Sequence, residues 1–175
     1  MTVLKIVEFP HPILKKVARK VGRAAMRDMP KLASDMLETM IEANGIGLAA
    51  PQIGKSLRMF IATIGDEPRV FVNPQILERE GFDVGEEGCL SFPGLYGMVE
   101  RPTYIKVRYQ DAEGREHIDE FEGFPARVIL HENDHLDGIL INDRATELYR
   151  PADDDEESAD TEINMETEEE KVEAL

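Results

Sequence analysis

Apolar residues with helical spacing first occur between Asp28 and Asn44. Leucine, methionine and isoleucine stand three or four positions apart there, at 32, 36, 37, 40 and 41, which is the pattern of an amphipathic helix. Asp28 suits the N-cap, Pro30 suits the first turn, and Asn44-Gly45 suits the end of a helix. The pattern therefore predicts one long helix in the first third of the chain.

Short segments rich in β-branched and aromatic residues follow this helix. They are separated by glycine, proline or an Asp-Ala-Glu-Gly turn, and they predict strands over 57–63, 70–73, 75–79, 105–110 and 116–121.

A second helix is predicted from near Pro125 to Asp137, with Gly138 just past its end. Its apolar residues lie on more than one side, so the helix should be largely buried; they are Val128, Ile129, Leu130 and Leu136. The order of helix, strands and helix predicts an α+β fold. We expect antiparallel or mixed β-sheets packed around this central C-terminal helix, with the long helix N-terminal to them.

The charge of the chain divides it into two parts. Residues 151–175 hold twelve acidic residues and one lysine, a net charge of −11, which leaves −5 of the total −16 for residues 1–150. We therefore expect one domain over 1–150, followed by an acidic and weakly structured tail over 151–175 that is either simply solvated or binds a partner. Neither part has a basic stripe with interleaved aromatic residues, which argues against direct binding to DNA or RNA.

The chain has one cysteine and no apolar run that approaches the roughly 18 residues of a membrane span. Its amino terminus does not resemble a signal peptide. A single thiol fits a reducing compartment, so we expect a cytoplasmic protein that does not enter a membrane.

Residues 131–135 read His-Glu-Asn-Asp-His. Two histidines four apart project from one side of a helix and can bind one metal ion, while Glu132 between them can reach a metal-bound water. The alternative interpretation of a histidine in an apolar helix is a core residue that is hydrogen-bonded and binds no metal. Asp134 is expected either to orient an imidazole or to be a charge on the helix surface.

Two further segments add to the pentad. Cys89 lies in Glu-Gly-Cys-Leu-Ser (87–91), and with His131 and His135 it would make three ligands and leave one open position. A thiolate with two imidazoles suits Fe(II), Zn(II), Co(II) or Ni(II). The segment 45–52, GIGLAAPQ, lacks the pattern of a phosphate loop, but Gln52 offers an amide donor for a developing oxyanion.

Together, GIGLAAPQ, EGCLS and HENDH resemble, in sequence and in order, the three motifs of the peptide deformylase family. The resemblance spans nearly all of residues 1–148. It implies hydrolytic removal of the formyl group from the N-formylmethionine of newly synthesised proteins, with release of formate. It also implies a divalent metal, natively Fe(II), held by Cys89, His131 and His135.

The resemblance implies roles for further residues. Glu132 would be the general acid and base, and the Gln52 side chain and the Leu90 backbone N–H would stabilise the oxyanion. Ile46 and Gly47 would contact an extended substrate beside a strand edge, and Phe124 and Val128, with Ile46 and His131, would accept the methionine side chain. We also expect Arg101 to pair with Glu87 and so hold the cysteine loop.

The same resemblance implies a nascent polypeptide as the main partner and transient association with the ribosome. We expect a monomer. Some family members end in a basic helix thought to touch the ribosome, and the acidic tail here excludes that contact with RNA phosphates. Two residues depart from the family pattern. Leu130 replaces a common glutamine, and Asn133 replaces an apolar residue and should place a polar group at the helix surface or near the pocket.

Two alternatives remain open from the sequence. A peptidase would share the histidine pentad, but a thiolate as third ligand and the EGCLS segment argue against it. A deformylase-like module that binds metal or nascent chains without turnover would share all three motifs.

Overall fold

A computed structural model describes residues 2–151 of the chain. The predicted acidic tail lies outside the described residues, apart from Pro151. The helical elements are η1 (Pro12–Lys15), α1 (Arg23–Met26), α2 (Met29–Glu42), η2 (Ala50–Ile53), α3 (Phe124–Leu136) and α4 (Ile141–Arg144). The strands are β1 (Gly47–Ala49), β2 (Met59–Ile64), β3 (Glu67–Glu80), β4 (Asp83–Cys89), β5 (Phe92–Arg101), β6 (Tyr104–Gln110), β7 (Glu116–Glu122) and β8 (Glu147–Tyr149).

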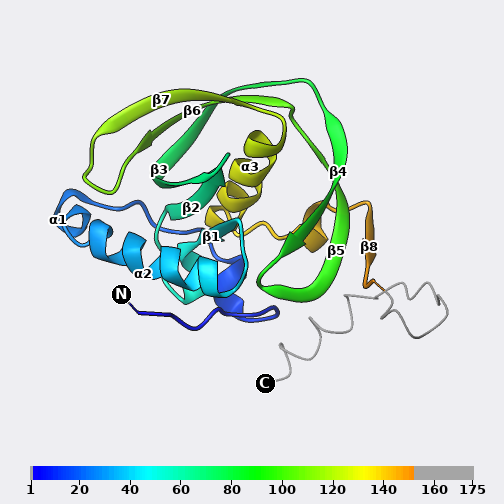
Figure 1. Ribbon diagram of the computed structural model, residues 1–175, viewed down its shortest axis with the longest axis horizontal. Coiled ribbons are helices and arrows are strands. Elements are labelled where there is room, and N and C mark those ends of the chain that lie inside the picture. The colour runs from blue at the N-terminus through cyan, green and yellow to red at the C-terminus, as the bar shows by residue number, and fades with distance from the viewer. Residues whose placement is uncertain (1, 152–175) are drawn as a thin grey trace.

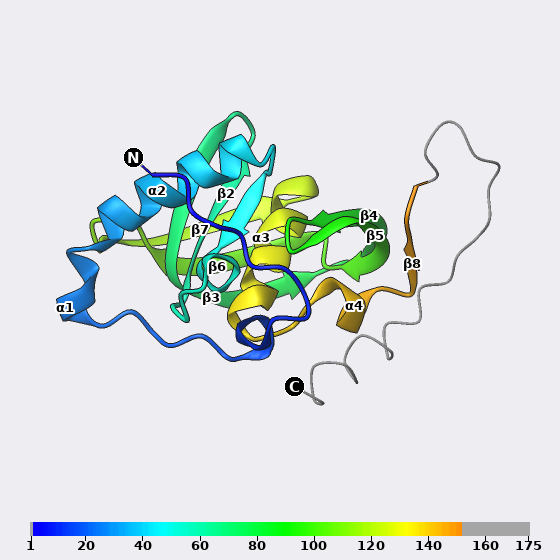
Figure 2. The same cartoon turned by 90° about the horizontal axis from the view of Figure 1, so that it is seen from below.

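The strands form two sheets whose ladders are antiparallel throughout the described residues. One sheet has five strands in the order β1-β2-β3-β6-β7, and the other has three in the order β4-β5-β8. The α3 helix lies between the two sheets, and α2 lies on the far side of β1 and β2 (Figures 1 and 2). The fold is therefore α+β with antiparallel sheets.

The five-stranded sheet is buried on both faces at its strand β2. Phe60 on β2 belongs to the core cluster under α3, together with Phe71, Tyr109 and Phe121. Met59 and Ile61, which point to the other face, pack with Met36 and Met40 of α2. Burial of each such side chain contributes about 1.5–3 kcal/mol, so both helices are fixed on the sheet by apolar contacts.

One predicted pair of strands is wrong. The segments 70–73 and 75–79 are parts of the single strand β3, whose register shifts between Val72 and Gln75. Asn73 has a positive φ of 50° there, and its side chain bonds both backbone groups of Val21. Since Asn73-Pro74 reads as a turn in the sequence, a bulge was mistaken for a break between strands.

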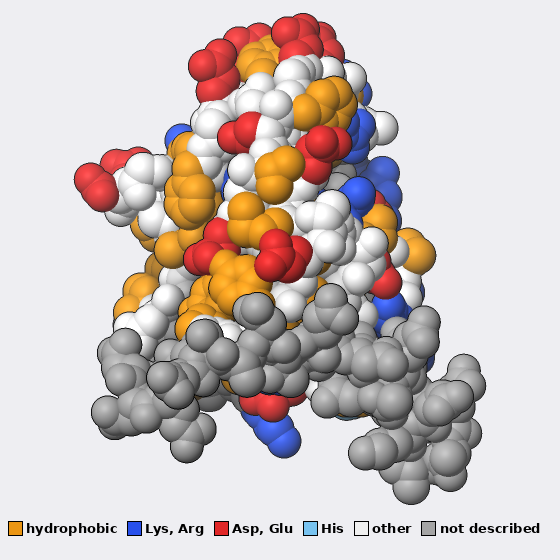
Figure 3. Space-filling view, turned by 90° about the vertical axis from the view of Figure 1, so that its right-hand side faces the viewer, with side chains coloured by type: hydrophobic (Ala, Val, Ile, Leu, Met, Phe, Trp, Pro, Cys, Tyr) orange, Lys and Arg blue, Asp and Glu red, His pale blue; other side chains and the backbone are white. Residues whose placement is uncertain are grey.

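Four strands were not predicted at all, namely β1, β4, β5 and β8. The hairpin of β4 and β5 carries the cysteine motif, and β8 pairs with β5 along three residues from Tyr96 to Met98. Figure 3 shows this side of the molecule, where hydrophobic and acidic side chains are intermixed. No helix among residues 2–151 is long and apolar enough to cross a membrane.

Candidate metal centre and cleft

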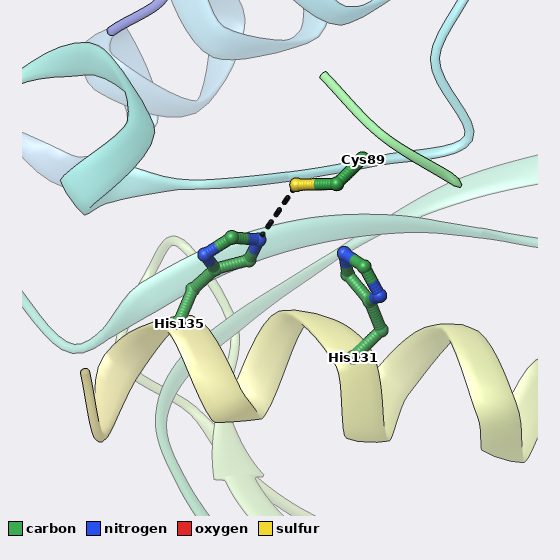
Figure 4. Close-up of side chains that lie close together, drawn as sticks. All are labelled: Cys89, His131 and His135. Carbon is green, nitrogen blue, oxygen red and sulfur yellow. Dashed lines mark hydrogen bonds between the residues drawn. The ribbon is translucent and has the colours of Figure 1, made fainter. Parts of the chain in front are cut away.

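The three predicted metal ligands come together. The ligand atoms of Cys89, His131 and His135 all lie within 4.8 Å of one another, and Cys89 Sγ lies 3.4 Å from His135 Nε2. Both imidazoles project from the same side of α3 toward the thiol, which lies above the helix at the end of β4 (Figure 4). The i, i+4 spacing in α3 therefore places the two rings side by side, and the sheet that packs over the helix supplies the sulfur.

Glu87 orients one of the imidazoles. Its Oε2 lies 2.8 Å from His131 Nδ1. The other ring nitrogen, Nε2, is therefore the one that can bind a metal together with Cys89. Arg101 donates to both carboxylate oxygens of Glu87, at 2.9 and 3.0 Å, so the predicted pair of Arg101 and Glu87 is confirmed. Although burial opposes its charge, the hydrogen bonds from His131 and Arg101 lower the pKa of Glu87 to about 2. Glu87 is thus a fixed anion beneath the site.

Asp134 takes neither of the two roles considered for it. It is 7% exposed, so it is not a surface charge, and it has no hydrogen bond to an imidazole within residues 2–151. Its carboxylate instead accepts from Arg101 at 2.5 Å and from Arg144 at 2.5 and 2.8 Å. Asp134 thereby ties the histidine helix to β5 and α4.

Arg127 was missed in the sequence. It is 7% exposed and donates to Glu87 at 2.9 Å, to Asp83 at 2.7 Å and to the Val99 carbonyl at 2.8 Å. The available signal was its position four residues before His131 on a helix expected to be buried, because a buried guanidinium needs an acidic partner. Arg127 of α3 thus binds two carboxylates of β4, Asp83 and Glu87, and Glu87 is bound by Arg101 as well.

Glu132 lies beside the ligands with one carboxylate oxygen unpaired. It is 4% exposed, and its Oε2 has no hydrogen-bond partner among the described residues. A Cβ on Gly47 would lie 2.3 Å from its Oε1, so only a glycine of β1 leaves room for the carboxylate. Burial raises the pKa of Glu132 to about 7. A carboxyl group with such a pKa can both accept and deliver a proton near neutral pH.

Gln52 is fixed with its amide nitrogen toward the cysteine. Its Oε1 accepts from the backbone N–H of Ala49 at 2.8 Å, and its Nε2 lies 3.2 Å from Ser91 Oγ and 3.6 Å from Cys89 Sγ. Gln52 is 1% exposed. The segment 45–52, in which Gln52 was the candidate amide donor, thus supplies a preorganised donor beside the thiol.

A cleft of about 690 Å³ opens over these residues. It lies between β1 and β4, which are edge strands of their respective sheets. All the predicted site residues except His135 line it: Ile46, Gly47, Gln52, Cys89, Leu90, Phe124, Val128, His131 and Glu132. Val128 is buried, whereas Ile46 and Phe124 are 49% and 62% exposed at its rim. The cleft therefore offers an apolar wall and the edges of two strands.

Asn133 does not lie where it was expected. It is 8% exposed and is not among the residues that line the cleft, so its amide lies neither at the helix surface nor in the pocket wall. Its Oδ1 has no hydrogen-bond partner among residues 2–151. A helix rotation of about 100° per residue turns position 133 away from the histidines and into the core.

The donor set fits a divalent metal. One sulfur and two imidazole nitrogens suit Fe(II), Zn(II), Co(II) or Ni(II), and three protein ligands leave a position open. Burial and the neighbouring His131 lower the pKa of His135, which favours the neutral imidazole that a metal needs. Hydrogen bonding to Cys89 and Glu87 raises the pKa of His131 despite its burial, so a cation bound there would displace its proton.

Comparisons with known proteins agree with one another. Residues 3–151 match the sequence profile of the family described as polypeptide deformylase. The chain is 48% identical over 151 residues to peptide deformylase 1 of Bacillus anthracis, which covers 85% of this chain and 96% of that protein. The crystal structure of peptide deformylase from Thermotoga maritima superposes with a TM-score of 0.81 at 42% identity, covering 83% of this chain and 99% of that one. The Met-Ala-Ser-bound class I type b enzyme from Acinetobacter baumannii gives 0.78 at 40% identity, over 82% and 100% of the two chains.

Proposed function

The chain belongs to the polypeptide deformylase family, and from this premise we propose which residues carry out the reaction. The activity is the metal-dependent hydrolysis of the N-formyl group of newly synthesised polypeptides. The convergence of three ligand atoms within 4.8 Å, with Cys89 and His131 lining the cleft, carries the assignment. Cys89, His131 and His135 hold the metal in this proposal, and the resemblance of the motifs favours Fe(II) as the native ion.

The bound metal supplies Lewis acidity, which polarises a carbonyl and lowers the pKa of water. Glu132 takes a proton from the attacking water and delivers it to the departing amine nitrogen, while the bond between the formyl carbon and that nitrogen breaks. Its unpaired Oε2 and its pKa of about 7 support this role. Formate and a free amino terminus are the products.

The oxyanion on the formyl oxygen is stabilised by Gln52 Nε2 and the Leu90 backbone N–H in this mechanism. The fixed direction of the Gln52 amide supports its role, because a donor that need not reorganise contributes most; loss of one such donor typically costs about 2.7–4 kcal/mol of barrier.

The substrate chain is proposed to lie extended between β1 and β4, each an edge strand of its sheet. Ile46, Gly47, Phe124 and Val128 would contact it, with the methionine side chain on the apolar wall. The Acinetobacter baumannii relative was solved with Met-Ala-Ser, a peptide that begins with methionine. That ligand supports the same placement here.

We further propose a catalytic domain over 1–150 with an acidic appendage over 151–175. A profile match over residues 3–151 supports this division. The proposal includes action as a cytoplasmic monomer that meets its substrate at the ribosome without the use of a basic C-terminal helix. The single cysteine supports the cytoplasmic location. The net charge of −11 over 151–175 supports action without a basic C-terminal helix.

The test is formate release from formyl-Met-Ala-Ser by protein purified anaerobically, with its metal content quantified. Glu132→Ala should keep the metal and lose about 10²–10⁴-fold in rate, as expected for a lost acid–base group. Glu122→Ala, which removes an exposed carboxylate outside the cleft, is the matched control and should keep full activity. Metal-loaded wild type without formate release would indicate a binding module, and cleavage of internal peptide bonds would indicate a peptidase.

A further inference from the structure

Basic residues are concentrated in one short segment of this acidic protein. Residues 15–31 hold seven lysines and arginines and one aspartate, a net charge of +6 within a chain of net charge −16. They are Lys15, Lys16, Arg19, Lys20, Arg23, Arg27 and Lys31, and all seven are exposed. The proposed chemistry uses none of them, because none lines the cleft.

Four of these cations carry no carboxylate partner among residues 2–151. At one end of the segment Lys15 pairs with Asp143, and at the other Lys31 pairs with Asp35, at 2.8 and 2.7 Å. The cations without an ion pair in the described part of the chain are Lys16, Arg19, Lys20 and Arg23. Most other arginines of the described chain are neutralised, as Arg101, Arg127 and Arg144 are by buried carboxylates.

The backbone that carries the four cations is held in place. Ala18 donates to the Leu136 carbonyl at 2.8 Å, Arg19 donates to the Ser56 carbonyl at 3.1 Å, and the side chain of Asn73 bonds both backbone groups of Val21. Ala18 and Val21 are buried between the exposed cations. The segment runs along one edge of the molecule between η1 and α1 (Figure 2). A ligand that binds there would not have to order the backbone, so that cost of binding is avoided.

We infer that this basic row, defined as Lys16, Arg19, Lys20 and Arg23, binds the phosphate backbone of duplex RNA. From Lys16 to Arg23 an extended chain reaches at most about 25 Å, so the row can contact several successive phosphates. Residues 15–31 contain no aromatic side chain, so the expectation against nucleic-acid binding holds for stacking of bases on aromatic rings. Contacts of lysine and arginine to phosphate need no aromatic residue. The choice of RNA rests on the proposed function, because a nascent polypeptide is made on a machine built of folded RNA.

An acidic membrane is the less favoured partner. Membrane-surface segments combine basic residues with a broad apolar face, usually on an amphipathic helix. Here α1 spans only Arg23–Met26, and Val17 is the one exposed large hydrophobic residue within 15–31. The opposite end of the molecule carries β4, β5 and β8 with intermixed apolar and acidic side chains (Figures 1 and 3), so the full chain should dock through the row and not through that end.

The test is fluorescence anisotropy of a labelled RNA hairpin titrated with the full chain, at 50 to 200 mM salt. Neutralisation of about four phosphates predicts a slope of log K against log salt of about −3.6, and therefore about a hundred-fold loss of affinity over this range. Lys16→Glu with Lys20→Glu and Arg23→Glu should abolish binding. The same three positions changed to Gln should lower the slope to about −1 without reversing the charge.

The matched control is Arg79→Glu with Arg108→Glu and Arg115→Glu, which changes the net charge equally at exposed sites outside the row. It should keep most of the affinity for RNA. Equal losses in the two triple variants, no binding by the wild type at 50 mM salt, or tighter binding to phosphatidylserine vesicles than to RNA would each overturn the inference. Formate release by the same preparations reports separately on the proposed function, and it should be unchanged in both triple variants.

Discussion

Gly47→Ala tests whether the room beside Glu132 is needed for activity. A Cβ at this position would lie 2.3 Å from Glu132 Oε1, so the carboxylate must retreat by about 0.7 Å to reach the 3.0 Å at which such contacts begin. The strand cannot move aside easily, because β1 is paired with β2 from Gly47 to Ala49 and the Ile46 carbonyl accepts from Thr63 at 2.8 Å. Displacement of the carboxylate is therefore the expected response.

The expected effect falls on turnover and not on the metal. A misplacement of about 1 Å can reduce a rate by about 10²-fold, so we expect kcat for formyl-Met-Ala-Ser to fall by about 10- to 100-fold, or about 1.4–2.7 kcal/mol of barrier. Metal content should be unchanged, since the three heavy atoms nearest to a Cβ on Gly47 all belong to Glu132 and not to a ligand. Gly22→Ala is the matched control, because a Cβ there meets no atom within 4 Å and activity should be kept.

A double variant separates this effect from lost substrate contact. If Gly47→Ala acts by moving Glu132, it should add almost nothing in a Glu132→Ala background. A full additional loss in that background would show that Gly47 acts through the substrate instead. A Gly47→Ala enzyme within three-fold of wild-type kcat would refute the steric argument altogether.

Three further predictions concern the groups around the site. Arg101→Ala leaves Glu87 and Asp134 buried without their shared cation, so it should destabilise the protein by about 3–5 kcal/mol and weaken metal retention by about 10–100-fold in chelator competition; unchanged retention would contradict it. The pKa of Glu87 is lowered from 4.5 to about 2, so the metal-free wild type should have a larger free energy of unfolding than Glu87→Gln. This difference should be fully present above about pH 4.5 and disappear as the pH falls through about 2. Urea unfolding across this range measures it, and a pH-independent difference would count against the ion-pair account. Asn133→Leu removes a buried carbonyl that has no partner in the described chain and should raise stability by about 1–3 kcal/mol, seen as a higher Tm; a lower Tm would show that the amide is satisfied.

The ligands on α3 were accessible from the sequence because the signal is local. Two histidines at i and i+4 in an apolar segment define one face of a helix without any knowledge of the rest of the fold. Cys89 is 42 residues away from His131 in the sequence, and no pattern of spacing places it near the helix. Its place as the single cysteine of the chain made it a candidate ligand, and the resemblance of three motifs in order strengthened that hypothesis.

The hairpin that carries Cys89 was missed for a physical reason. A strand is recognised by alternation of apolar residues that face a core, but β4 turns Glu87 inward to bind Arg101 and Arg127. Gly85, also on β4, faces the guanidinium of Arg127, where a Cβ would lie 2.8 Å from Cζ. The buried side of β4 is therefore polar, and a search for alternating apolar residues does not detect this strand.

X-ray absorption spectroscopy of the zinc-loaded protein would test most directly whether Cys89, His131 and His135 bind one metal. The account predicts one sulfur neighbour at about 2.3 Å together with imidazole nitrogens at about 2.0–2.1 Å. The sulfur signal should disappear in Cys89→Ser. A spectrum of the wild type with light-atom neighbours only, or with two sulfurs, would contradict the proposed site.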